Sequence, residues 1–299
     1  MLGNIKSSAE DISTMLRIAD QLSEGYERIS VLYEDLGIKL SVSKSINIAA
    51  YQNMLTQRIA KSYVAVAYNQ MPGRYKRELL TSVDLFEGQM KSMIRSASTE
   101  DIRSAVNVVQ IMWKNYKKLV LNWEKMDEIS VTKVLEKAHI MMATCDKVAQ
   151  EIENYAQTIP DYKAFFVQKN GEAVEDKNNI ARQTHLAGLQ RVYSQRIAIY
   201  YLMNALKVDT RLSQERMNTC IANYKKNFEQ MISSKINTKA INNGLNNAHK
   251  DWDAIEQLCA SANKEKINTV LTHSSELFEK LDELNLLYEK HMDHMFMQK

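Results

Sequence analysis

Apolar residues recur at alternating steps of three and four along most of the chain, a spacing that predicts amphipathic α-helices. The clearest stripes run through residues 12–36, 102–123, 131–155 and 277–295. Because their period stays near 3.5 residues, each stripe can face one neighbouring helix over many turns, as in antiparallel bundles. We therefore expect an all-α fold of tandem antiparallel four-helix bundles with about nine long helices.

Turn-forming and capping residues separate the stripes. The breaks that we expect are Pro72-Gly73, Ser98 to Asp101, Asp209-Thr210 and Asn242 to Gly244. Between residues 160 and 176 the helical period is lost. There Asn170-Gly171 lies between two short apolar runs, which predicts a small hairpin or an ordered loop.

The composition agrees with helices and excludes several other classes of protein. With 8 glycines and 2 prolines in 299 residues, the chain has too few turn formers for an all-β or Rossmann-type fold. Apolar residues make up 45% and charged residues 25%, so the chain can bury a core. The 39 basic and 36 acidic residues are too balanced for a nucleic-acid-binding protein, and we expect no such partner.

The chain lacks the patterns of a disulfide framework, an export signal and a membrane span. Its three cysteines, Cys145, Cys220 and Cys259, include no C-x-x-C pair, and we interpret them as small buried apolar residues. Acidic residues stand near the N-terminus where an apolar export segment would lie, and no run approaches 18 apolar residues. The sequence therefore assigns the protein to no cellular compartment.

A repeat appears when the chain is aligned with itself at an offset of 138 residues. Residues 48–60 then match residues 186–198, and the identical positions include Gln52, Gln57, Arg58, Ile59 and Ala60. This repeat is too long for a solenoid unit, and it indicates two duplicated bundles. We expect a lead helix over residues 1–40, a first bundle over 41–159, a connector over 160–177 and a second bundle over 178–299.

The two repeated segments resemble a known signature. INIAAYQNMLTQRIAKSY (Ile46 to Tyr63) is similar to the start of the PilJ and NarX-like sensor domains of type IV pilus chemotaxis transducers and nitrate sensor kinases. HLAGLQRVYSQRIAIYY (His185 to Tyr201) is similar as well. The resemblance implies a non-enzymatic sensor bundle, commonly extracytoplasmic, that binds a small ligand and transmits a signal through its end helices.

Such receptors usually carry membrane helices around the sensor bundle and an output domain after it. Neither is found in these 299 residues. Signalling would then pass to a separate partner or through a homodimer.

One polar line on the second motif helix is a candidate binding site for a small solute or anion. Thr184, Gly188, Arg191 and Gln195 follow at i, i+4, i+7 and i+11, on one face of a helix. Gly188 permits close approach of another helix, and Arg191 and Gln195 supply hydrogen-bond donors. By resemblance to the nitrate-sensor branch, Arg191 would bind the anion in an exposed site at a dimer interface. The alternative for Arg191 is a surface ion pair.

The first copy has Asn53 where the second has Arg191, so we expect at most one anion site, in the second bundle. The repeated Gln57-Arg58 and Gln195-Arg196 pairs lie at the margin of the apolar face of each motif helix. There each arginine needs a carboxylate, carbonyl or anionic partner. It forms either one wall of a ligand pocket or a clamp between helices.

Catalytic, cofactor and metal sites are not expected. The chain has no Gly-rich phosphate loop, H-E-x-x-H, G-x-S-x-G or C-x-x-C-H stretch. A di-iron centre needs two Glu-x-x-His motifs, and only Glu136 with His139 has that spacing. His291 and His294 lack a third ligand for zinc.

The alternative function is a structural or adaptor protein in which the motif arginines only cross-link helices.

Overall fold

The computed structural model describes residues 42–158 and 172–297, and this part of the chain consists of α-helices and one 3-10 turn without strands. The α-helices are α2 (Val42–Ala67), α3 (Pro72–Ser96), α4 (Glu100–Val120), α5 (Glu128–Thr158), α7 (Glu172–Ala205), α8 (Thr210–Ile232), α9 (Lys239–Cys259) and α10 (Ile267–Met297), and the 3-10 turn is η1 (Lys264–Lys266). The all-α prediction is confirmed. The expected lead helix over residues 1–40 lies outside the described residues.

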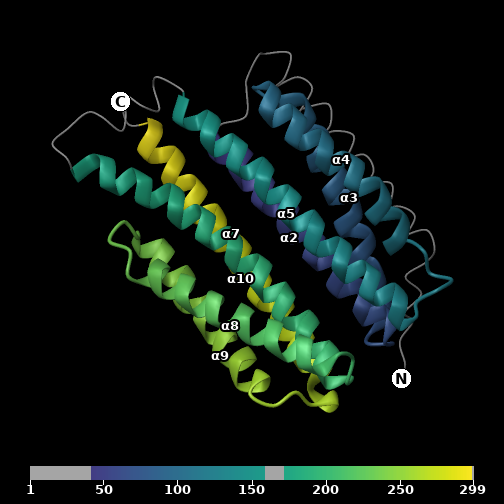
Figure 1. Ribbon diagram of the computed structural model, residues 1–299. Helices are drawn as coiled ribbons and strands as arrows, with labels where there is room; N and C mark the ends of the chain where they lie inside the picture. Colours follow the sequence, from purple (N-terminus) through teal and green to yellow (C-terminus); the bar gives the residue numbers. More distant parts are fainter. Residues whose placement is uncertain (1–41, 159–171, 298–299) are drawn as a thin grey trace, which may run out of the picture. The chain divides into compact units, whose positions relative to one another are not determined.

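The helices pack in two groups of four, and the two motif helices lie where the groups meet (Figure 1). In the first group α2 packs against α3 and α5, and α5 packs against α4. In the second group α7 packs against α8 and α10, and α10 packs against α9. Helix α2 also packs along α7, and it contacts α10. The motif helices are consequently surrounded by protein on several sides.

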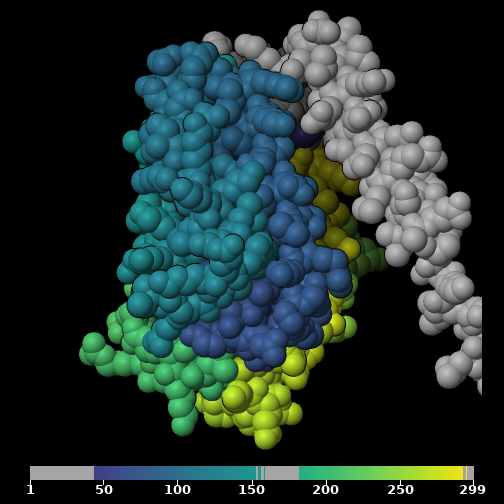
Figure 2. All heavy atoms as spheres, turned by 90° about the vertical axis from the view of Figure 1, so that its right-hand side faces the viewer, coloured from purple at the N-terminus to yellow at the C-terminus, as the bar shows by residue number. Residues whose placement is uncertain are grey.

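Helices α3 and α4 form an outer layer of the first group. Figure 2 faces this layer and shows little of α2, which lies behind it. Several apolar side chains of the layer are nevertheless exposed, namely Leu80, Leu85, Val108 and Ile111. None of the described helices is long and apolar enough to cross a membrane.

Capping residues and a proline account for several of the helix starts. Thr99 and Thr238 are N-caps whose Oγ1 atoms accept hydrogen bonds from Ile102 N and Ile241 N, both at 3.2 Å. Pro72 begins α3, where its missing N–H is not needed. The predicted break at 242–244 is wrong, because these residues lie inside α9.

Gly244 instead marks a close helix contact. A Cβ atom at this position would lie 3.1 Å from Leu284 Cδ1 of α10. The glycine therefore reflects the packing of α9 on α10 and not the end of a helix.

The predicted hairpin near Asn170-Gly171 is not supported where it can be assessed. Helix α7 begins at Glu172, so Ala173 and Val174, expected to flank the turn, are helical. The remaining residues of the predicted hairpin lie outside the described part. The proposed domain boundaries stay a prediction.

The repeat seen in the sequence recurs in the hydrogen bonds. Gln52 Nε2 donates to Phe86 O at 2.8 Å, and the equivalent Gln190 Nε2 donates to Tyr224 O at 2.9 Å. Likewise Tyr63 OH donates to Lys125 O, and Tyr201 OH donates to Asn263 O.

Aromatic stacking in the two cores follows the same pattern. Phe86 stacks on Trp113 with centroids 4.0 Å apart, and Tyr224 stacks on Trp252 with centroids 3.9 Å apart. Equivalent positions of the two copies therefore make equivalent contacts in their cores.

Candidate ligand-binding site

The two buried glutamines of the motif differ in their hydrogen bonds. Gln57 is 4% exposed, and its Nε2 donates to Ala138 O of α5 at 3.0 Å and to Thr56 Oγ1 at 3.1 Å. Gln195 is fully buried, and its Nε2 donates to Ser194 Oγ at 3.2 Å while its Oε1 has no hydrogen-bond partner among the residues that the structure describes. Gln57 thus links α2 to α5, and Gln195 keeps an unused acceptor.

Arg191 is buried and paired with a carboxylate. Its side chain is 1% exposed, and its Nη1 lies 2.6 Å from Asp282 Oδ1 of α10. Its Nη2 donates to Asn47 Oδ1 of α2 at 3.2 Å, and its guanidinium stacks over the Tyr51 ring at 5.1 Å. The expectation of an exposed site is therefore wrong, because α2 and α10 both cover Arg191.

Further polar groups extend this Arg191 cluster, which comprises Asn47, Tyr51, Arg191, Asp282, Asn285 and Glu289. Asn47 Nδ2 donates to Glu289 Oε2, and Asn285 Nδ2 donates to Asn47 Oδ1. Burial lowers the pKa of Arg191 and Asp282 opposes that shift, so the guanidinium stays charged at neutral pH. The cluster joins α2, α7 and α10 through a cation whose charge is already balanced.

Two other residues of the predicted line are also buried. A Cβ atom on Gly188 would lie 3.1 Å from the Ala50 Cβ of α2, which confirms that Gly188 permits close helix approach. Thr184 is 2% exposed. The line of Thr184, Gly188, Arg191 and Gln195 faces the protein interior, not an open surface.

Arg58 is paired within the first copy. Its Nε lies 3.4 Å from Glu78 Oε1 of α3, and its guanidinium lies 4.8 Å from the ring centre of Phe278 of α10. The buried Lys61 shares the same carboxylate, with Nζ 2.9 Å from Glu78 Oε1. Burial alone would raise the pKa of Glu78, but Lys61 and Arg58 outweigh it and hold the pKa at about 2.

Arg196, the counterpart of Arg58, has different surroundings. Its Nη2 donates to Tyr200 OH at 3.0 Å and its Nη1 to Met142 Sδ of α5 at 3.5 Å, while its Nε is buried and has no hydrogen-bond partner. Among the described residues, no carboxylate forms an ion pair with Arg196. Arg58 and Arg191 each pair with a carboxylate. In the described part of the chain, the hydrogen-bond partners of Arg196 are all neutral.

The repeat explains why no carboxylate of the described residues forms an ion pair with Arg196. The position equivalent to Glu78 in the second copy is Arg216, which adds positive charge in place of negative charge. Burial, together with the charges of Arg196 and Arg216, lowers the pKa of His139 on α5. Arg196, Arg216 and His139 therefore form a basic cluster of α5, α7 and α8, and we call it the Arg196 cluster.

Several partners of the motif arginines were not identified from sequence. Asp282 and Glu78 carry no motif, and only the folded chain brings them to Arg191 and Arg58. One signal was available for Arg216, because aligning the copies places it opposite Glu78.

Comparison with known proteins finds one family to which part of the chain is similar. A family model described as PilJ, the type IV pili methyl-accepting chemotaxis transducer N-terminal domain, matches residues 38–142. No curated protein and no solved structure gives a match. The matched residues include the first motif helix, and the second copy lies outside them. The match confirms the resemblance to PilJ domains predicted from the first motif helix.

Proposed function

We propose, from the match of residues 38–142 to the PilJ family model, that the chain is a non-enzymatic signal-transduction module that senses a small anion at the Arg196 cluster. The single observation that carries this proposal is that Arg196 is largely buried without a paired carboxylate among the described residues. A buried guanidinium without a counter-charge is costly, so an anion from solution would stabilise it.

The comparison of Arg58 with Arg196 supports this proposal. Both arginines occupy the same position of the motif. In each copy the next helix along the chain, α3 in the first and α8 in the second, carries one residue at the same place in the repeat. That position supplies the carboxylate of Glu78 to Arg58 and the guanidinium of Arg216 to Arg196. In the first copy Glu78 pairs with Arg58, whereas in the second copy Asp146 of α5 acts on Arg196 only from beyond ion-pair distance, and two cations and His139 lie beside it, which favours an external anion.

Signal transmission would start from the position of Arg196 between helices. Its guanidinium contacts Met142 of α5 in the first group, although Arg196 itself belongs to α7 in the second group. An anion that draws Arg196 toward Arg216 of α8 would weaken this contact and shift α7 relative to α5. Small helix shifts of this kind are a known means of passing a signal along a bundle, to terminal helices or to a separate partner.

The test is a thermal-unfolding screen of the full chain with nitrate, nitrite, other small anions and amino acids, each against an equal concentration of chloride. A ligand at about 100 times its Kd raises stability by about 2.7 kcal/mol, enough to raise the Tm by several degrees. Arg196→Gln is expected to abolish the shift, while the matched Arg58→Gln retains it.

A charge substitution sharpens this test. Arg216→Glu gives the second copy the carboxylate that Glu78 supplies to the first, so it is expected to abolish anion binding while keeping Arg196 charged. If no anion raises the Tm at millimolar concentration, or if Arg58→Gln removes the shift as fully as Arg196→Gln, anion sensing at this cluster is wrong.

The second candidate function is a structural or adaptor protein. The ion pairs of Arg58 with Glu78 and of Arg191 with Asp282 favour it, because both arginines cross-link helices without any ligand. Under this alternative Arg196→Gln leaves every Tm response to anions unchanged.

A further inference from the structure

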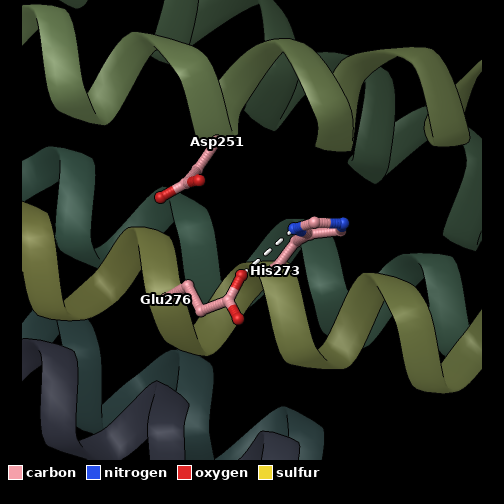
Figure 3. A group of neighbouring side chains, drawn as sticks. All are labelled: Asp251, His273 and Glu276. Atoms are coloured by element: carbon pink, nitrogen blue, oxygen red, sulfur yellow. Dashed lines mark ion pairs between the residues drawn. The ribbon is translucent and has the colours of Figure 1, made fainter.

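Asp251, His273 and Glu276 bring three possible metal ligands together between α9 and α10 (Figure 3). One ligand atom of each residue lies within 4.8 Å of those of the other two. Asp251 extends from α9, while His273 and Glu276 both extend from α10, three residues apart and therefore on one face of the helix. This cluster is separate from the motif arginines described above.

The pair on α10 has the spacing of a metal site. His273 Nδ1 lies 3.2 Å from Glu276 Oε2. In a tetrahedral zinc site with bonds of about 2.0 Å, neighbouring ligand atoms are about 3.3 Å apart. These two atoms could bind one ion with little movement, and Asp251 would have to approach by rotation of its side chain.

Two of the three ligand atoms are buried and contact ionisable neighbours. Asp251 Oδ2 and His273 Nδ1 are the buried atoms. Asp251 Oδ2 pairs with Lys280 Nζ, and His273 Nδ1 lies beside Glu276 Oε2, a contact that is an ion pair only when the imidazole is protonated. Lys280 therefore supplies a single positive charge beside Asp251. A divalent cation in the cluster would instead neutralise the carboxylates of both Asp251 and Glu276.

We propose that Asp251, His273 and Glu276 bind a Zn²⁺ ion through His273 Nδ1 and one oxygen of each carboxylate, with water in the fourth position. Imidazole and carboxylate groups are ordinary zinc ligands, and two carboxylates balance the charge of the ion. Lys280 releases Asp251 when the metal binds. The ion then links α9 to α10, the helix that also packs on α7 and contacts α2.

The test is isothermal titration of the untagged full chain with Zn²⁺ in a non-chelating buffer. We expect one ion per chain and a rise in Tm that EDTA reverses. His273→Gln and Asp251→Asn are each expected to weaken binding at least about tenfold. Lys280→Met keeps the aliphatic stem but removes the competing ammonium, so it is expected to tighten binding.

The matched control is His249→Gln. His249 and Asp253 form a similar ion pair on α9, at 3.4 Å, but they belong to no group of three such ligands among the described residues. This variant is expected to bind Zn²⁺ like the wild type.

Several results would overturn the proposal. These are wild-type protein that does not bind Zn²⁺ at millimolar concentration, equal binding by wild type, His273→Gln and Asp251→Asn, and weaker binding by Lys280→Met. A loss of affinity in His249→Gln as large as that in His273→Gln would also overturn it. Because Asp251, His273 and Lys280 are tested separately, the failure of one variant to fold leaves the others decisive.

Discussion

The three motif arginines show how strongly the surroundings of a buried cation can differ within one fold. Arg58 shares Glu78 with Lys61, Arg191 is paired with Asp282, and Arg196 has only neutral partners among the described residues. Removing one member of a buried ion pair leaves the other charge unpaired, which costs about 3–5 kcal/mol. The same substitution should therefore have different effects at these sites.

Glu78 provides a prediction about acid stability. Its pKa of about 2 lies below the unfolded value of 4.5, so the folded state favours the ionised form. That stability is fully present above about pH 4.5 and is lost as the pH falls toward 2. We expect Glu78→Gln to lower the free energy of unfolding at pH 7 by about 3 kcal/mol, because Lys61 and Arg58 lose their counter-ion.

The measurement is urea unfolding of wild type and Glu78→Gln between pH 7 and pH 2.5. The difference between the two proteins should shrink as the pH falls, since wild-type Glu78 then becomes protonated. Glu256→Gln is the control, because its ion pair with Lys225 is exposed and contributes little. A pH-independent difference for Glu78→Gln would contradict the assigned ion pair.

At the scale of elements, the contact between α2 and α7 depends on a missing side chain. Gly188 faces Ala50, and an added Cβ would lie 3.1 Å from the Cβ of that residue. Both atoms are attached directly to their helix backbones, so relief requires the helices themselves to move. Gly88 of α3 has nothing within 4 Å of its own added Cβ.

These two glycines make a matched pair of substitutions. We expect Gly188→Ala to lower the free energy of unfolding by about 1–2 kcal/mol, since overpacking between α2 and α7 outweighs the gain in helix propensity. Gly88→Ala is expected to raise it by about 0.5–1 kcal/mol, because only the propensity changes. Chemical unfolding checks both, and stabilisation by Gly188→Ala would show that the helices are not in close contact there.

At the scale of the whole molecule, the sequence predicts helices better than it predicts the contacts between them. The apolar period locates the helices because each buried stripe must face a neighbour, and the core residues of α4 and α9 follow it. The period does not reveal which polar group meets Arg191, because Asp282 is 91 residues away along the chain. The break predicted at Gly244 is wrong for the same reason, since the role of this glycine depends on α10.

For the candidate sites too, the sequence predicts the helices but not the contacts between them. The motif located Arg58, Arg191 and Arg196 on buried helices, but the identity of their partners required the packing of other helices. The three possible zinc ligands likewise could not be grouped from the sequence, because Asp251 comes from α9 whereas His273 and Glu276 come from α10. The internal repeat supplies some of this missing information on contacts, because aligning the two copies places Arg216 opposite Glu78.

The interface between the two groups of helices leads to a prediction about the whole chain. Arg191 of α7 bonds to Asn47 of α2, and the buried Lys61 of α2 lies 3.5 Å from Ser275 Oγ of α10. Separating the groups would expose Lys61 and Arg191 together with the apolar surface of α2 and α7. We therefore expect residues 42–158 and 172–297 to remain associated after a protease site inserted between residues 159 and 171 is cut.

Size-exclusion chromatography of the cut protein is the measurement, with the two fragments expected to elute as one peak at the position of the uncut chain. Introducing Gly188→Val in the cut protein should weaken this association, because the larger side chain separates α2 from α7. The matched Gly88→Val has open space around it and should leave the association intact. Free fragments in the cut protein without any substitution would mean that the α2–α7 contact depends on the covalent connection.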